Sequence, residues 1–176
     1  NVGIGSFVMD SALAGSIQNV AIGHYALSSV TTSDGNVAVG ANSAYALTTG
    51  ANNVAIGSAA LQVHTTGARN IAIGYGAMND TDAGSDSLNS DDNIFIGHDA
   101  GGGTWANAET NNCVAIGNYA MDSALNTANN SAAIGYAALG SVTTADSSVA
   151  IGKEALLSIT TGDGNIGIGQ HAMQVH

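Results

Sequence analysis

Residues 36–50 read Asn-Val-Ala-Val-Gly-Ala-Asn-Ser-Ala-Tyr-Ala-Leu-Thr-Thr-Gly: a short apolar segment, a glycine, a second apolar segment and a threonine pair. Variants of this unit recur along the whole chain. The glycine after the first segment occurs ten times, at spacings of 18, 17, 17, 17, 23, 20, 18, 17 and 17 residues. These glycines are Gly5, Gly23, Gly40, Gly57, Gly74, Gly97, Gly117, Gly135, Gly152 and Gly169. Such self-similarity at a fixed period indicates a repeat architecture.

The length of the unit restricts the fold. Seventeen residues are too few for a strand, a helix and their turns, but they suit a coil of two or three short strands. We therefore predict an all-β fold, a parallel β-solenoid of about ten 17-residue coils, with residues 1–176 forming a single repeat domain. Neighbouring coils would lie about 4.8 Å apart, so that ten coils span roughly 45 Å. Stacking must supply the core, because one unit cannot bury its apolar face alone.

The first apolar segment has two different faces. In a strand, Val20 and Ile22 point to one side and Ala21 points to the other. Nearly every unit has Ala or Gly at this middle position, Phe95 being the exception. A small residue suggests that another backbone approaches closely, either from the same coil or from a second chain. Because a narrow roll buries limited surface per residue, we expect neighbouring chains to complete the core.

Two columns of identical residues are expected to be structural. Most units begin with asparagine, and stacked Asn side chains can hydrogen-bond along the axis and satisfy buried amides. Cys113 stands in this column and is expected to be an inert small residue. The ten repeat glycines are expected to adopt positive φ or to occupy places where a Cβ atom would collide.

The unit at residues 36–50 closely resembles the repeats of bacteriophage tail fibres. It is also similar to the head repeats of trimeric autotransporter adhesins, whose Ala-Ile-Gly motif recurs at a shorter period. The resemblance covers essentially the whole chain. It implies a homotrimer of left-handed parallel β-rolls, on a virion surface or otherwise extracellular, that attaches to a receptor on a host surface, with glycans among the candidate receptors. The period and the Thr-Thr pairs favour the tail-fibre resemblance.

Composition excludes several classes of partner. Two basic residues stand against thirteen acidic ones, and the net charge of -11 argues against binding to nucleic acid or to anionic membranes. No apolar run approaches the length of a membrane-spanning helix, so membrane insertion is not expected. The chain begins and ends inside a repeat, and we expect it to be part of a longer fibre.

Catalytic chemistry has little support in the sequence. The histidines are expected to be exposed and without function, because no serine or cysteine nucleophile motif accompanies them. They are His24, His64, His98, His171 and His176. The glycines recur with the coil and form no phosphate-binding loop. The sequence therefore predicts a protein that is not an enzyme and that has no cofactor, apart from a candidate calcium ion.

Two insertions near residues 79–92 and 101–112 interrupt the regular period. Asp80, Asp82 and Asp86 resemble a calcium-binding loop, and the alternative is a solvated acidic loop. Trp105 follows three glycines and is expected to be exposed, where it would stack on a sugar or a partner; the alternative is a Trp folded back to cap the roll. We expect both insertions to leave the roll at one corner and to form a receptor-binding patch.

The sequence thus predicts a structural and receptor-binding segment of a viral tail fibre or spike. A bacterial adhesin head is the alternative, and an ice-binding solenoid is a third hypothesis, because regular rows of threonine can order water. Adjacent threonines weaken that hypothesis, since one of each pair should point inward in a strand. The pairs are Thr31-Thr32, Thr48-Thr49, Thr65-Thr66, Thr143-Thr144 and Thr160-Thr161.

Overall fold

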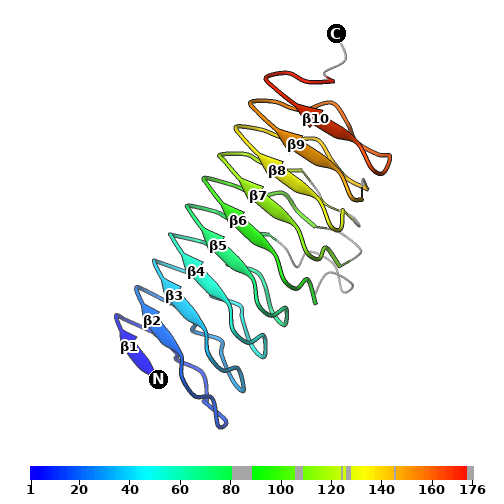
Figure 1. The fold of residues 1–176 in the computed structure, drawn as a ribbon. Coiled ribbons are helices and arrows are strands. Elements are labelled where there is room, and N and C mark those ends of the chain that lie inside the picture. The colour runs from blue at the N-terminus through cyan, green and yellow to red at the C-terminus, as the bar shows by residue number, and fades with distance from the viewer. Residues whose placement is uncertain (81–88, 106–108, 124, 126–127, 145, 174–176) are drawn as a thin grey trace.

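The fold is a stack of coils, each carrying one strand of a single sheet (Figure 1). The computed structural model describes residues 1–80, 89–105, 109–123, 125, 128–144 and 146–173. Its ten strands form one parallel sheet in sequence order. They are β1 (Val2–Ile4), β2 (Val20–Ile22), β3 (Val37–Val39), β4 (Val54–Ile56), β5 (Ile71–Ile73), β6 (Ile94–Ile96), β7 (Val114–Ile116), β8 (Ala132–Ile134), β9 (Val149–Ile151) and β10 (Ile166–Ile168). The predicted all-β, parallel β-solenoid is confirmed.

The register places equivalent residues of neighbouring units directly above one another. Val20 pairs with Val37 and Ala21 pairs with Ala38, and the same match holds between all neighbouring strands. Each position of the unit therefore becomes a column that runs along the solenoid axis.

The rest of the coil differs from the expected two or three strands, because each coil contains only one named strand among the described residues. The second and fourth residues after each repeat glycine adopt positive φ, as in Tyr25 (58°) and Leu27 (49°). This alternation prevents an extended strand. Hydrogen bonds still join the coils there, for example from the Leu27 N–H to the Ser43 carbonyl at 3.1 Å.

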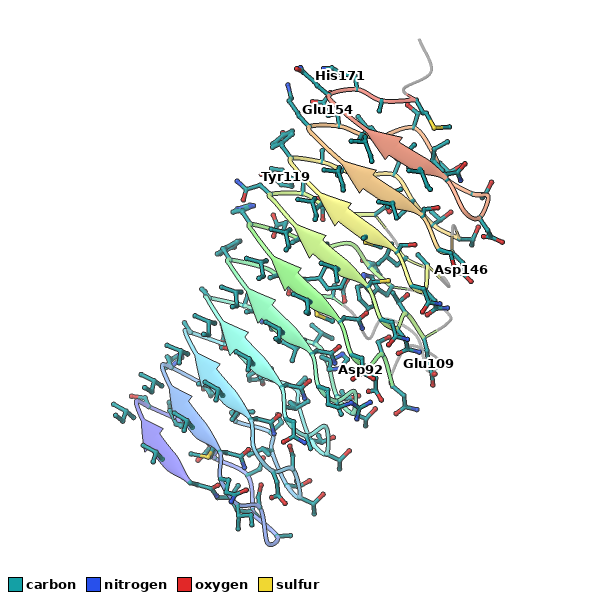
Figure 2. The ribbon with its side chains drawn as sticks, in the orientation of Figure 1. Asp92, Glu109, Tyr119, Asp146, Glu154 and His171 are labelled. Atoms are coloured by element: carbon teal, nitrogen blue, oxygen red, sulfur yellow. The ribbon has the colours of Figure 1, made fainter. Side chains whose placement is uncertain are left out.

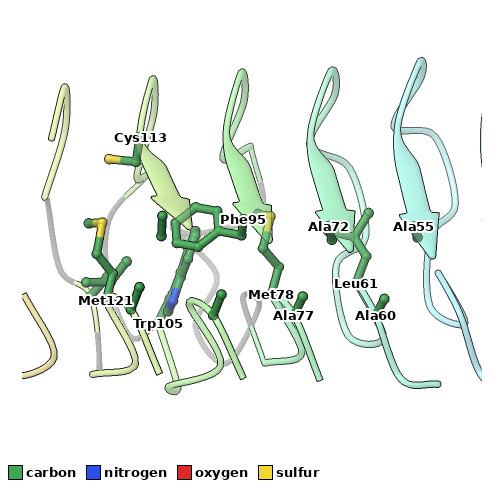
Figure 3. Close-up of a cluster of buried hydrophobic side chains, with 14 of the residues drawn as sticks. Ala55, Ala60, Leu61, Ala72, Ala77, Met78, Phe95, Trp105, Cys113 and Met121 are labelled. Atoms are coloured by element: carbon green, nitrogen blue, oxygen red, sulfur yellow. The ribbon is translucent and has the colours of Figure 1, made fainter. Parts of the chain in front are cut away.

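The core lies between the strands and these returning segments (Figure 3). The middle residue of a strand, such as Ala55, points inward and packs with the fully buried Ala60 and Leu61 of the returning segment. Of the two partners that the sequence allowed for the small-residue face, the structure therefore shows another segment of the same chain.

The two predicted structural columns are confirmed. Gly40 has a φ of 140°, and a Cβ atom there would lie 2.4 Å from the carbonyl oxygen of Gly57. The side-chain oxygen of Asn36 accepts the backbone N–H of Asn53 at 2.8 Å. Cys113 is buried and its thiol donates to the Ala128 carbonyl. Burial raises the pKa of this thiol to about 11, which suits the inert role that the sequence predicted.

Candidate functional site

The outer surface of the sheet is apolar along its whole length. The first and third residues of every strand point away from the core, and we call these residues the aliphatic face. They are Val2, Ile4, Val20, Ile22, Val37, Val39, Val54, Ile56, Ile71, Ile73, Ile94, Ile96, Val114, Ile116, Ala132, Ile134, Val149, Ile151, Ile166 and Ile168. Not one of them is polar.

This face is accessible to solvent in the single chain. Ile22, Ile134 and Ile151 are each exposed by 38–40%. The first column of the face is half-buried except at the two end strands, which are more exposed. A continuous apolar surface with polar borders is typical of an interaction site rather than of a solvated surface.

Acidic residues border one side of the face, and Figure 2 shows Asp92, Glu109 and Asp146 along this edge. Several of these carboxylates have a structural role. Asp146 accepts the backbone N–H of Asn129 at 2.6 Å, which links two coils. Arg69 forms ion pairs with Asp91 (3.0 Å) and Asp92 (2.6 Å), and its hydrogen bond holds the pKa of Asp92 below the usual range.

Aromatic and histidine side chains border the opposite side, and Figure 2 shows Tyr119, Glu154 and His171 there. We call the following residues the aromatic edge, since each lies one or two positions after a repeat glycine. They are Phe7, His24, Tyr25, Tyr75, His98, Tyr119 and Tyr136. The two borders therefore differ in chemistry.

The two insertions begin side by side, as predicted. The Asp80 carboxylate accepts the Thr104 hydroxyl at 2.6 Å, and the Asp80 carbonyl accepts the Trp105 backbone N–H at 3.1 Å. Asp82 and Asp86 lie outside the described residues. Within the described part of the chain, no three His, Cys, Asp or Glu side chains come together as ligands of one ion. The calcium site therefore stays a prediction.

Trp105 is fully buried, so the expected exposure is wrong and the alternative of a Trp folded back onto the roll fits the structure. Its ring lies 5.6 Å from that of Phe95, with the planes inclined at 55° (Figure 3). The physical reason is a gap in the core. Gly101 stands where most other coils have Leu or Met, and a Cβ atom on it would lie 2.5 Å from the Phe95 ring. Phe95 and Trp105 fill this space, and the indole offers no free face for a receptor.

His64 is also fully buried, contrary to the expected exposure. It occupies the position of Leu47 in the preceding coil, and this alignment of units is the sequence signal that could have revealed it. Its Nε2 lies 3.2 Å from Nδ2 of Asn70, and burial lowers its pKa to about 4. His24 and His98 are exposed as expected, His171 is half-buried, and His176 lies outside the described residues.

In three of the five threonine pairs, the hydroxyl of the first residue joins neighbouring coils. Thr31, Thr48 and Thr143 donate from Oγ1 to a carbonyl oxygen of the next coil, at 3.2, 3.0 and 2.9 Å. Because these hydroxyls are already bonded, they do not favour the ice-binding hypothesis, which needs a row of hydroxyls open to water.

The part of the chain that the structure describes contains no helix with the length and apolar character needed to cross a membrane. Comparison of the chain with protein-family models, with curated proteins and with solved structures found no match. The candidate site therefore rests on the geometry of the chain itself, and its most extensive feature is the aliphatic face.

Proposed function

We propose that this chain is a structural segment of an extracellular attachment fibre, in which parallel copies bury their aliphatic faces against one another. The observation that carries the proposal is the uninterrupted apolar surface across all ten strands. Burial of apolar surface contributes about 25 cal/mol per Å². An exposed face of this length therefore gives a strong driving force for association.

The occupant of this face is a second copy of the same chain. Rows of side chains repeat about every 4.8 Å along the axis, so a partner must offer apolar rows at the same pitch. A second copy of the chain offers such rows, because its own face repeats at the same spacing. The face comprises two residues from each of ten strands, 20 in all. A standard protein interface uses about 20–30 residues on each side, so the face as a whole is comparable to one such interface. A three-fold arrangement would divide its residues between two neighbouring chains.

A three-fold arrangement would cover both columns of the face. Around an axis parallel to the solenoid, the first column of one chain would meet the third column of the next. Both columns are aliphatic throughout, so every contact is apolar and all three faces are covered in a closed assembly. The resemblance of residues 36–50 to tail-fibre repeats supports the same trimer, its place on a virion surface and its role in attachment to a host.

The oligomeric state tests this assembly. We expect light scattering at micromolar concentration to give the mass of a trimer. The Ile56→Asp/Ile116→Asp variant places charge on the face, where both side chains are 38% exposed, and should be a folded monomer. The matched control is Ser58→Asp/Asn118→Asp, which changes exposed positions two residues further along the same coils and should remain trimeric.

Circular dichroism establishes that each variant is folded. A monomeric parent chain would overturn the proposed association, and a dimer would overturn the three-fold arrangement. Antibodies raised against the segment test its location, because they should label fibres on the parent particle in electron micrographs. Labelling of the particle interior would contradict the attachment role.

A further inference from the structure

The aromatic edge concentrates rings that the core does not use. Four of the chain's five tyrosines lie on it, together with Phe7, His24 and His98. The core is filled instead by Ala, Leu and Met and by the Phe95–Trp105 pair. Tyr75 is 58% exposed and Tyr136 is 49% exposed, so this border presents ring surface to solvent.

Four of these rings form a continuous ladder over the coils of β5 to β8. Tyr75 and His98 are stacked at a centroid distance of 5.2 Å and an angle of 19°. His98 and Tyr119 meet edge-to-face at 5.3 Å, and so do Tyr119 and Tyr136 at 5.7 Å. Each ring is thus held by a neighbour one coil away, which limits the side-chain entropy that a bound ligand must remove.

Tyr75 ends this ladder and has a ring face available. His98 stacks against one face of the ring, and the side chain is still 58% exposed. The two preceding coils carry small side chains at the equivalent positions, and we call these residues the shelf. The shelf residues are Ala41, Asn42, Ser58 and Ala59. A flat apolar ring above a shelf of small residues can stack against the apolar face of a sugar.

Polar groups beside the ladder suit hydroxyl ligands. Nδ1 of His98 lies 3.1 Å from the Asp99 carboxylate, and Nδ1 of His171 lies 3.0 Å from Glu154. These pairs offer both donors and acceptors. Lys153 is the only Lys or Arg on this edge, and the chain carries a net charge of -11. Polyanions are therefore repelled, and a neutral ligand is favoured.

The form of the edge points to a polymer. No enclosed pocket is found in the described parts of the chain, so a small ligand would find little surface to surround it. The ladder instead extends over three coil steps, roughly 14 Å at β spacing. Its step from ring to ring is close to the length of one pyranose unit, so consecutive sugars can meet consecutive coils.

We propose that the aromatic edge binds a neutral polysaccharide along the roll axis, with Tyr75 and Tyr136 as stacking platforms. The inference deepens the proposed attachment function and rests on it. A trimer would present three such edges, so that weak contacts gain strength by avidity. A second copy of this chain fits the edge less well, because its residues vary from coil to coil while the aliphatic face is uniform.

Calorimetric titration of the intact protein tests the proposal. The probes are cellohexaose, chitohexaose, maltohexaose and linear mannohexaose, with a heparin hexasaccharide as the anionic counter-probe. We expect at least one neutral probe to bind and heparin not to bind. Tyr75→Ala should weaken binding about tenfold, the order expected for loss of one stacked ring. The control is Tyr45→Ala, which removes a tyrosine that is 41% exposed and lies outside the ladder. Its ring meets Tyr25 edge-to-face at 5.9 Å, so this control tests whether binding is confined to the ladder.

The outcomes separate this inference from the proposed assembly. Absence of binding by every neutral probe at millimolar concentration would overturn the inference while the trimer stands. Equal losses in Tyr75→Ala and Tyr45→Ala would overturn the assignment to the ladder. If Tyr75→Ala instead dissociates the trimer, the edge is a contact between chains. The monomeric Ile56→Asp/Ile116→Asp variant should retain one binding site per chain.

Discussion

The side-chain oxygen of Asn53 accepts the backbone N–H of Asn70, one coil further along the axis, at 2.9 Å. Its amide nitrogen donates to the Gly67 carbonyl at 2.9 Å and to the side-chain oxygen of Asn36 at 3.2 Å. All of these groups are buried. One carboxamide therefore satisfies polar groups in three neighbouring coils.

Replacement of Asn53 by alanine should lower the free energy of unfolding by about 2–4 kcal/mol, because buried groups lose their partners. Asn53→Ser should cost about half as much. Serine keeps an acceptor for the N–H, as Ser131 does for Ser148 at 3.1 Å. Urea unfolding followed by circular dichroism measures both values. Equal losses would show that the column contributes by packing rather than by hydrogen bonding.

The glycine column should be equally intolerant of change. Gly57 has a φ of 133°, and a Cβ atom there would lie 2.3 Å from the Gly74 carbonyl oxygen. We expect Gly57→Ala to cost about 3 kcal/mol through collision and backbone strain. Gly164→Ala separates the two causes, because Gly164 has a φ of 71° but no atom lies within 4 Å of the place that a methyl group would take. Gly164→Ala should lower the free energy of unfolding by about 1 kcal/mol.

His64 should make stability depend on pH. Burial lowers its pKa from 6.5 to about 4, so between these values the unfolded chain binds a proton that the folded chain does not. The free energy of unfolding should therefore be highest above pH 6.5 and fall as the pH drops toward 4. The difference between the two pKa values corresponds to a decrease of about 3 kcal/mol in the free energy of unfolding. His64→Leu, which restores the residue type of Leu47, should remove this contribution.

The comparison of parent and His64→Leu requires unfolding measurements at neutral pH and near pH 4.5. Other groups titrate in both proteins, so only the difference between the two curves reports on His64. If the free energy of unfolding changes with pH in the same way in both proteins, protonation of His64 does not destabilise the folded state, and the core does not hold the imidazole neutral.

Trp105 should act on stability rather than on recognition. Its truncation to alanine removes a fully buried ring from beside Phe95 and should cost about 3–5 kcal/mol. Trp105→Phe retains most of the volume and should cost less. Thermal unfolding measures both. The Phe variant should bind the neutral hexasaccharides as the parent does, and a loss of binding there would return Trp105 to the recognition surface.

The predicted calcium site can be tested by removing the metal. If Asp80, Asp82 and Asp86 bind calcium, a chelator should lower the melting temperature, because an ion that binds only the folded state stabilises it. Asp82→Ala should abolish this response. Asp10→Ala, at an exposed position in the first coil, should preserve it. Equal melting temperatures with and without chelator would rule out a stabilising calcium ion.

The fold could be predicted from the sequence because its stabilising contacts join equivalent positions of successive units. The glycine spacing reveals the coil, and the Asn column reveals the axial hydrogen bonds. The conformation of the returning segment could not be predicted, since Tyr25 and Leu27 are ordinary residues in a left-handed conformation that only tertiary contacts enforce.

The packing around Phe95 could not be predicted from the sequence either. The large ring is accommodated by Gly101 on the returning segment, and the remaining space is filled by Trp105. Each residue alone has a plausible surface or turn role. Their complementarity depends on volumes that meet in space, so the burial of Trp105 does not follow from its glycine-rich neighbourhood.

The common register of all ten strands also determines how gain or loss of a repeat unit changes the length of the solenoid. Val20 pairs with Val37 in the same way as Val37 pairs with Val54. Excision of residues 37–53 would join Asn36 to Val54 and bring β2 onto β4 with the pairing already present elsewhere. Each duplication or loss of a unit thus alters the reach by about 4.8 Å and creates no new kind of contact. Recombination between repeats can therefore change the length of the solenoid in steps of one whole coil.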